Sequence, residues 1–159
     1  FASVSDTVKI KTTSGNISVR SLTADSLSLT AATGDIKVNS VLLNNGTNIK
    51  TSTGTVKLTD ISCGSILADS NTGDMSFKNV LVSGSLSVES GTGNVGFDNS
   101  DADTVCVKTG TGDVTGTLLS EKVFATKTST GTVRVPKTAS GGKCEITTST
   151  GNIIIDIQK

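Results

Sequence analysis

A short phrase, Ser/Thr-Gly followed by a polar and then an apolar residue, recurs eight times along this chain of 159 residues. Successive glycines of the phrase are always 19 or 20 residues apart. They are Gly15, Gly34, Gly54, Gly73, Gly93, Gly112, Gly131 and Gly151. A fixed period of this length is typical of a solenoid, in which each repeat is one structural unit that stacks on its neighbours.

Apolar and polar residues alternate after each of these glycines. The second and fourth residues after a glycine are apolar in nearly every repeat, as in Ile17 and Val19, and the residues between them are mostly polar or small. A second alternating segment precedes each glycine, as in Leu86 and Val88. Period-two alternation indicates β-strands with one buried face. A third, weaker apolar column follows seven residues after the glycine, so two or three short strands form each coil.

The order of residues within the phrase favours a solenoid over a meander of hairpins. Hairpin turns typically read Asn-Gly or Asp-Gly, whereas here the glycine comes first, as in Gly34-Asp35. We therefore predict an all-β fold, a parallel β-solenoid (single-stranded β-helix) of about eight coils that forms a single domain over residues 1–159. The eight glycines are predicted to be its structural corners, because glycine adopts positive φ without a Cβ clash.

Hydroxyl residues accompany the glycines. The residue before each glycine and the residue two positions earlier are Ser or Thr, except for Ala31. Stacked Thr-x-Thr resembles the ice-binding face of some antifreeze proteins, and ice binding is a remote alternative. Both positions share the odd offset of the buried apolar residues, however. We therefore expect these hydroxyls to point inward and to form internal hydrogen bonds at the corner.

Side chains suited to catalysis are scarce. The chain contains no His, which removes the commonest general base near neutral pH. It has no Trp or Tyr and only four Phe, so the aromatic platforms of sugar-cleaving grooves are missing from its composition. A polysaccharide-acting enzyme is a second remote alternative. We expect no enzymatic activity, no catalytic residues and no cofactor.

The net charge of the chain does not indicate which class of partner it binds. Fourteen basic and 14 acidic residues balance each other, so no global field favours nucleic acid. No run of about 20 apolar residues is present, so this segment is not expected to insert into a membrane.

The stretch DNSDAD contains Asp98, Asp101 and Asp103 and is the one candidate for a metal site. Calcium takes several oxygen ligands, and three carboxylates could supply them. The stretch lacks the glycine and the terminal Glu of an EF-hand loop. A solvated corner loop is the alternative interpretation, and otherwise no metal is expected.

The three cysteines, Cys63, Cys106 and Cys144, are predicted to be free thiols. Cys144 occupies a buried column and Cys106 has outward parity. Two intervening strand spacings would separate these two residues by about 9.6 Å, too far for a disulfide.

Two irregular segments and the last coil complete the organisation. Bulged loops are predicted for PKTASGGK (136–143) and VLLNNGTN (41–48). The final NIIIDI segment is expected to form an open end of the solenoid. An open edge invites strand pairing, so a cap, an extension or end-to-end self-association is expected there.

The recurring order of alternating strand, Ser/Thr-Gly-Asp/Asn and alternating strand resembles a large bacterial family of β-strand-repeat domains of unknown function that carry an adhesin label. The resemblance covers essentially the whole chain through its eight glycines. It implies a β-solenoid that often follows a membrane anchor and faces the cell exterior, and it brings no catalytic residues.

These features together predict a non-enzymatic module at the cell surface or outside the cell, an adhesin or a binding or spacer domain. The expected partner is a protein or a glycan, and the anchor is expected in a segment outside this chain. The alternative is an envelope or intracellular scaffold whose solenoid serves as a regulatory assembly surface.

Overall fold

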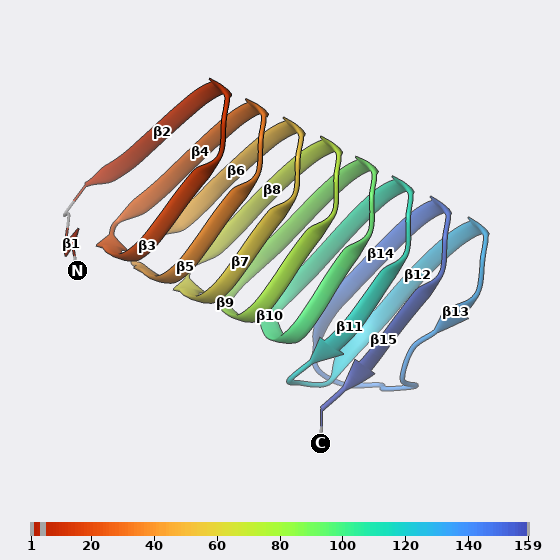
Figure 1. Ribbon diagram of the computed structural model, residues 1–159. Helices are drawn as coiled ribbons and strands as arrows, with labels where there is room; N and C mark the ends of the chain where they lie inside the picture. Colours follow the sequence, from red (N-terminus) through yellow and green to blue (C-terminus); the bar gives the residue numbers. More distant parts are fainter. Residues whose placement is uncertain (1, 4–5, 159) are drawn as a thin grey trace.

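The protein is a flattened rod of stacked coils. The computed structural model describes residues 2–3 and 6–158, and that part of the chain forms strands but no helix. Each coil rises in one sheet, turns at a glycine and returns in a second sheet (Figure 1). The predicted parallel β-solenoid is confirmed, with about seven turns instead of eight, because eight stacked corners enclose seven full repeats.

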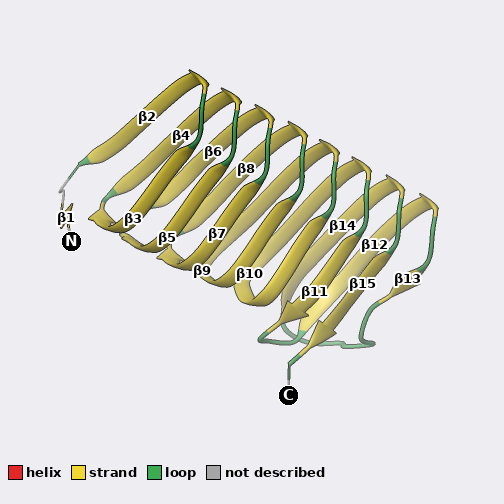
Figure 2. Ribbon diagram, viewed as in Figure 1, coloured by secondary structure: helices red, strands yellow, loops and turns green. Residues whose placement is uncertain are grey.

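The first sheet holds the strands that lead up to the glycines (Figure 2). In spatial order its members are β2 (Thr7–Ser14), β4 (Ser26–Thr33), β6 (Gly46–Thr53), β8 (Ser65–Thr72), the second halves of β9 (Met75–Thr92) and β10 (Val95–Thr111), β14 (Gly142–Thr150) and β12 (Lys122–Thr130). All of these pairs are parallel and in register, so equivalent side chains stack from coil to coil.

The second sheet holds the strands that follow the glycines. In spatial order its members are β1 (Ala2–Ser3), β3 (Ile17–Ala24), β5 (Ile36–Leu43), β7 (Val56–Cys63), the first halves of β9 and β10, β11 (Val114–Leu118), β15 (Ile153–Ile157) and β13 (Val133–Arg134). Five of its strands bend at a residue with positive φ, which sets off a short third side. These residues are Ser21, Ser40, Asp60, Asn79 and Asn99.

The last two coils are exchanged in space relative to the sequence. β14 lies between β10 and β12, and β15 lies between β11 and β13 (Figure 1). We call β14 and β15 the inserted coil, and β12 and β13 the terminal coil. The Gly112 amide donates to the Thr150 carbonyl at 2.9 Å, and the Gly151 amide donates to the Thr130 carbonyl at 2.8 Å.

The expectation that NIIIDI forms the open end is therefore wrong. Ile153 and Ile155 are buried, because neighbouring strands cover β15 on both sides. The terminal coil lies at the end of the rod instead, where Val123 and Val133 are exposed.

The core consists of stacked apolar columns between the sheets. Phe77 and Phe97 stack inside it with ring centroids 5.2 Å apart. The third apolar column, seven residues after each glycine, is predicted to include Leu119. In the structure Leu118 is buried in this place and Leu119 is exposed. The register explains this shift: Phe97 pairs with Gly116 and Ser100 with Leu118, so β11 reaches the column with one residue fewer than β10.

The motif glycines form the corners, as predicted. All eight have positive φ, from 127° at Gly15 to 148° at Gly112. Close stacking adds a second requirement, because a Cβ on Gly93 would overlap the carbonyl oxygen of Gly73 in the coil below.

Asn and Asp residues after the glycines link successive corners. The Asn16 side-chain oxygen accepts a hydrogen bond from the Asp35 amide at 2.9 Å, and Asp35 accepts one from the Thr55 amide at 2.9 Å. In the exchanged region Asp113 accepts from the Asn152 amide at 2.7 Å, and Asn152 accepts from the Thr132 amide. Each of these bonds satisfies a backbone N–H donor at a turn.

The two predicted bulged loops differ in outcome. Residues 135–141 lie outside strands between β13 and β14, so most of the PKTASGGK loop is confirmed. Within 41–48 only residues 44–45 leave the strands, and this bulge prediction is wrong. The Asn45 carbonyl accepts the Gly64 amide of the next coil, which keeps this corner in the regular stack.

Candidate binding groove

The two hydroxyl columns beside the glycines point in different directions. In the inner column, three positions before the glycine, the side chains are buried, as in Ser70 and Thr148, or half-buried, as in Thr12 and Thr128. In the outer column, directly before the glycine, they are exposed, as in Thr72 and Thr150. The inward prediction is confirmed for the inner column and wrong for the outer one, because the chain already leaves the sheet there to make the corner.

Only part of the inner column forms the expected internal hydrogen bonds. The hydroxyls of Thr109, Thr128 and Thr148 donate to glycine carbonyls at 3.0–3.3 Å. In the middle of the rod the buried hydroxyls lack a partner among the described residues. These are Thr51, Ser70 and Ser90, which are in register on three successive coils.

An open groove of about 740 Å³ lies on the described part of the chain. It runs along the third corner, where the third side meets the first sheet, and we call it the third-corner groove. Its polar lining includes Asn44, Ser62, Ser83, Asp101, Asp103, Ser120, Glu121, Lys122 and Ser140. Its apolar lining includes Leu43, Cys63, Leu81 and Val82.

A buried ion pair lies at one end of this groove. The Lys122 Nζ is 2.7 Å from Asp101 Oδ1 and also donates to the Ser120 hydroxyl. Only 3% of the Lys122 side chain and 22% of the Asp101 side chain are exposed. Lys122 begins the terminal coil and Asp101 belongs to β10, so the pair spans the position at which the inserted coil enters the stack.

Alignment of the repeats does not single out this lysine. Equivalent positions of the other repeats hold Asp, Asn or Gly, for example Asp25, Asn45 and Gly64. No repeat-based argument therefore marks Lys122 as a buried cation, and its role depends on the exchanged order of the last two coils.

The three calcium candidates lie apart in the structure. Asp98 is on the outer face of the second sheet, with its Oδ2 4.0 Å from the Lys78 Nζ. Asp101 is paired with Lys122, and Asp103 lies at the exposed rim of the groove. Among the described residues no three His, Cys, Asp or Glu side chains are grouped to hold a metal ion. The structure does not bring these ligands together, and the calcium site stays a prediction.

All three cysteines are free thiols, as predicted. Cys106 and Cys144 are nevertheless closer than two coils, because the insertion places β14 directly beside β10, where Cys144 pairs with Val105. Burial raises the pKa of Cys144 to about 12, although the charge of Lys122 opposes the shift. Burial likewise raises the pKa of Cys63 to about 11, opposed by a hydrogen bond to the Ser65 carbonyl.

Comparison with known protein families identifies the family to which the domain belongs. The family description Toastrack DUF4097 matches residues 2–90 and 48–159, two overlapping segments that together span almost the whole chain. No curated protein and no solved structure matches. Over the described residues no helix is long and apolar enough to cross a membrane. The chain therefore belongs to the Toastrack family, a domain of unknown function with β-solenoid architecture.

Proposed function

We propose that this domain is a non-enzymatic cell-surface module that binds a protein or glycan through the third-corner groove and uses the rest of the rod as a rigid spacer. The groove is the observation that supports this function. The side chains that line it differ from coil to coil, as in Asn44, Ser83 and Asp103. A lining of that kind can select a ligand.

The chemistry of the groove suits binding better than catalysis. Hydroxyl, amide and carboxylate groups such as Ser83, Asn44 and Asp103 are set beside exposed Leu81, a combination typical of ligand sites. The chain contains no His, and the Lys122 ammonium already faces Asp101. The Ser140 hydroxyl donates a hydrogen bond to the Glu121 carboxylate at 3.0 Å in the lining, but both side chains are exposed. Neither residue has the buried, oriented setting that activates a nucleophile.

A binding screen with a matched pair of variants tests the groove. The purified domain is screened against arrayed glycans and surface proteins, and its ligand is then offered to Ser83→Arg and Ser76→Arg. Ser83 lines the groove, whereas Ser76 is exposed on the outer face of the second sheet. We expect Ser83→Arg to abolish binding and Ser76→Arg to retain it. Equal binding by both variants would refute a role for the groove.

The cell-surface location needs a separate test on the full-length protein. A protease added to intact cells should remove the domain if it faces outward, as the adhesin interpretation requires. Protection in intact cells, together with digestion after lysis, would instead favour the envelope or intracellular scaffold.

A further inference from the structure

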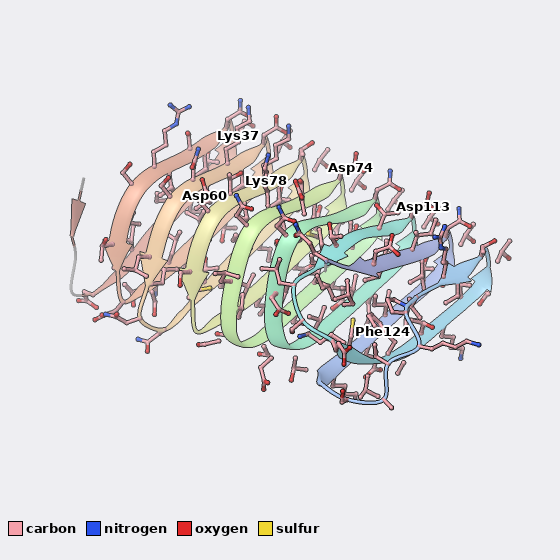
Figure 3. The ribbon with its side chains drawn as sticks, turned by 90° about the horizontal axis from the view of Figure 1, so that it is seen from below. Lys37, Asp60, Asp74, Lys78, Asp113 and Phe124 are labelled. Carbon is pink, nitrogen blue, oxygen red and sulfur yellow. The ribbon has the colours of Figure 1, made fainter. Side chains whose placement is uncertain are left out.

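We infer that the outer face of β3, β5 and β7 binds an acidic polysaccharide. This surface lies on a different side of the rod from the third-corner groove and does not depend on the function proposed above. We define the cationic face as Arg20, Lys37 and Lys57, together with the exposed polar side chains between them. Figure 3 shows Lys37 projecting away from the ribbon on this side.

Strand register brings the three cations together. Lys37 of β5 and Lys57 of β7 are direct partners on adjacent parallel strands, which places their backbones about 4.8 Å apart. Arg20 of β3 pairs with Asn39, two residues beyond Lys37 on the same face. A shallow depression of about 130 Å³ lies among these residues, and its polar lining is Ser18, Arg20, Lys37, Asn39, Lys57 and Thr59.

These cations are not neutralised by the protein. Like charges directly opposite each other destabilise a sheet, and two lysines elsewhere on the outer faces of the rod do have an acidic neighbour. Lys50 lies 3.7 Å from Asp69, and Lys78 lies 4.0 Å from Asp98. Among the described residues, Arg20, Lys37 and Lys57 form no ion pair. A bound anion would relieve the repulsion that the sheet carries here.

A second copy of the chain is a poor occupant. Residues 60–121 carry nine acidic and two basic residues, and residues 1–59 carry three acidic and six basic residues. Seven of those nine carboxylates are already engaged in ion pairs or hydrogen bonds within the rod. They are Asp60, Asp69, Asp74, Asp98, Asp101, Asp113 and Glu121.

The face also suits a flexible glycan better than nucleic acid or a membrane. Its described side chains include no aromatic ring on which a base could stack. Binding to anionic lipid typically needs four to eight clustered cations. A long duplex or a flat bilayer would also extend over the acidic middle of the rod. Asn39, Thr59 and Ser18 offer hydrogen-bonding groups for sugar hydroxyls between the charges.

The test measures binding of the purified domain to polygalacturonate, with dextran as the neutral polysaccharide. Wild type should bind polygalacturonate, not dextran, and should lose affinity as salt is raised from 50 to 300 mM. Lys37→Gln/Lys57→Gln should bind about tenfold more weakly. Lys9→Gln/Lys11→Gln makes the same change in net charge on the first sheet and should bind like wild type.

Three results would overturn the inference. The first is equal weakening by both double variants, which would indicate net charge alone. The second is binding to duplex DNA or to phosphatidylglycerol vesicles as tight as binding to polygalacturonate. The third is self-association in light scattering that Lys37→Gln/Lys57→Gln abolishes, because a second copy would then occupy the face. The groove variant Ser83→Arg should leave polygalacturonate binding intact, so failure of the groove proposal is distinguishable.

Discussion

Asn152 accepts a hydrogen bond from the backbone amide of Thr132 at 2.9 Å, although Thr132 comes earlier in the chain and lies farther out along the rod. The bond fastens the terminal coil to the inserted coil. Asn152→Ala should therefore cost about 1 kcal/mol and speed amide exchange in residues 122–134. Thr132→Ala keeps the backbone donor and should have little effect. Unchanged exchange in Asn152→Ala would show that this bond does not hold the terminal coil.

The Lys122–Asp101 pair should matter far more than an exposed pair. Lys122→Met leaves a mostly buried carboxylate without its partner and should lower the free energy of unfolding by about 3 kcal/mol. Lys50→Met removes an exposed lysine and should cost no more than about 0.5 kcal/mol. Urea denaturation measures both. Adding Asp101→Asn to Lys122→Met should recover much of the loss, and a further drop would contradict the ion-pair explanation.

Two neighbouring glycines should respond oppositely to the same substitution. Gly93 has φ of +146° and its Cβ would strike the coil below, so Gly93→Ala should destabilise the rod by several kcal/mol or prevent folding. A Cβ at Gly96 meets nothing within 4 Å, and Gly96→Ala should be neutral or slightly stabilising. Thermal melting of the two variants compares them, and similar losses would refute the corner explanation.

Some hydroxyls of the inner column should stabilise the fold and others should destabilise it. Ser70 has a buried hydroxyl without a described partner, so Ser70→Ala should leave stability unchanged or raise it by about 1 kcal/mol. The Thr148 hydroxyl donates to the Gly112 carbonyl at 3.2 Å, and Thr148→Val should cost about 1 kcal/mol. If Ser70→Ala proved the more destabilising in urea, a bound water must complete the Ser70 site.

The buried thiols should make the fold sensitive to alkali. The pKa values of Cys144 and Cys63 are raised in the folded protein, so the unfolded chain loses these protons first. Stability is then fully present below pH 9 and falls as the pH rises toward 11 and 12. Melting temperatures between pH 7 and 11 should show the fall, and Cys144→Ala should reduce it. Cys106→Ala keeps both buried thiols and should follow wild type.

Local patterning made most of the fold predictable. Alternation around the eight glycines identifies inward residues such as Val56 and Leu58, because each coil repeats the same packing problem. The failures involve interactions beyond one repeat. The exchange of the last two coils depends on which coil best covers β10. The odd offset that the outer hydroxyl column shares with the buried residues could not reveal that this column leaves the sheet at the corner.

One signal of the exchange was nevertheless present. The corner ladder needs Asn or Asp to accept a bond from the next coil, and Thr132 is one of two Thr residues at that position. Thr132 lies in the outermost of the described coils, where no further described amide needs an acceptor. The candidate site was harder to foresee, because Lys122 and Asp101 meet only as a result of the exchange.

The inserted coil also changes how the rod can be assembled. In an ordinary solenoid each turn rests on the one made just before it, so folding can follow synthesis from end to end. Here residues 142–150 supply the strand beside β10. At this junction the hydrogen bonds from Thr148 to Gly112 and from Asn152 to Asp113 join positions 36 and 39 residues apart. Such long-range closure slows folding. Removal of the inserted coil, which is the last one in the sequence, would leave a gap inside the rod with two facing unpaired edges. It would not simply shorten the rod by one turn.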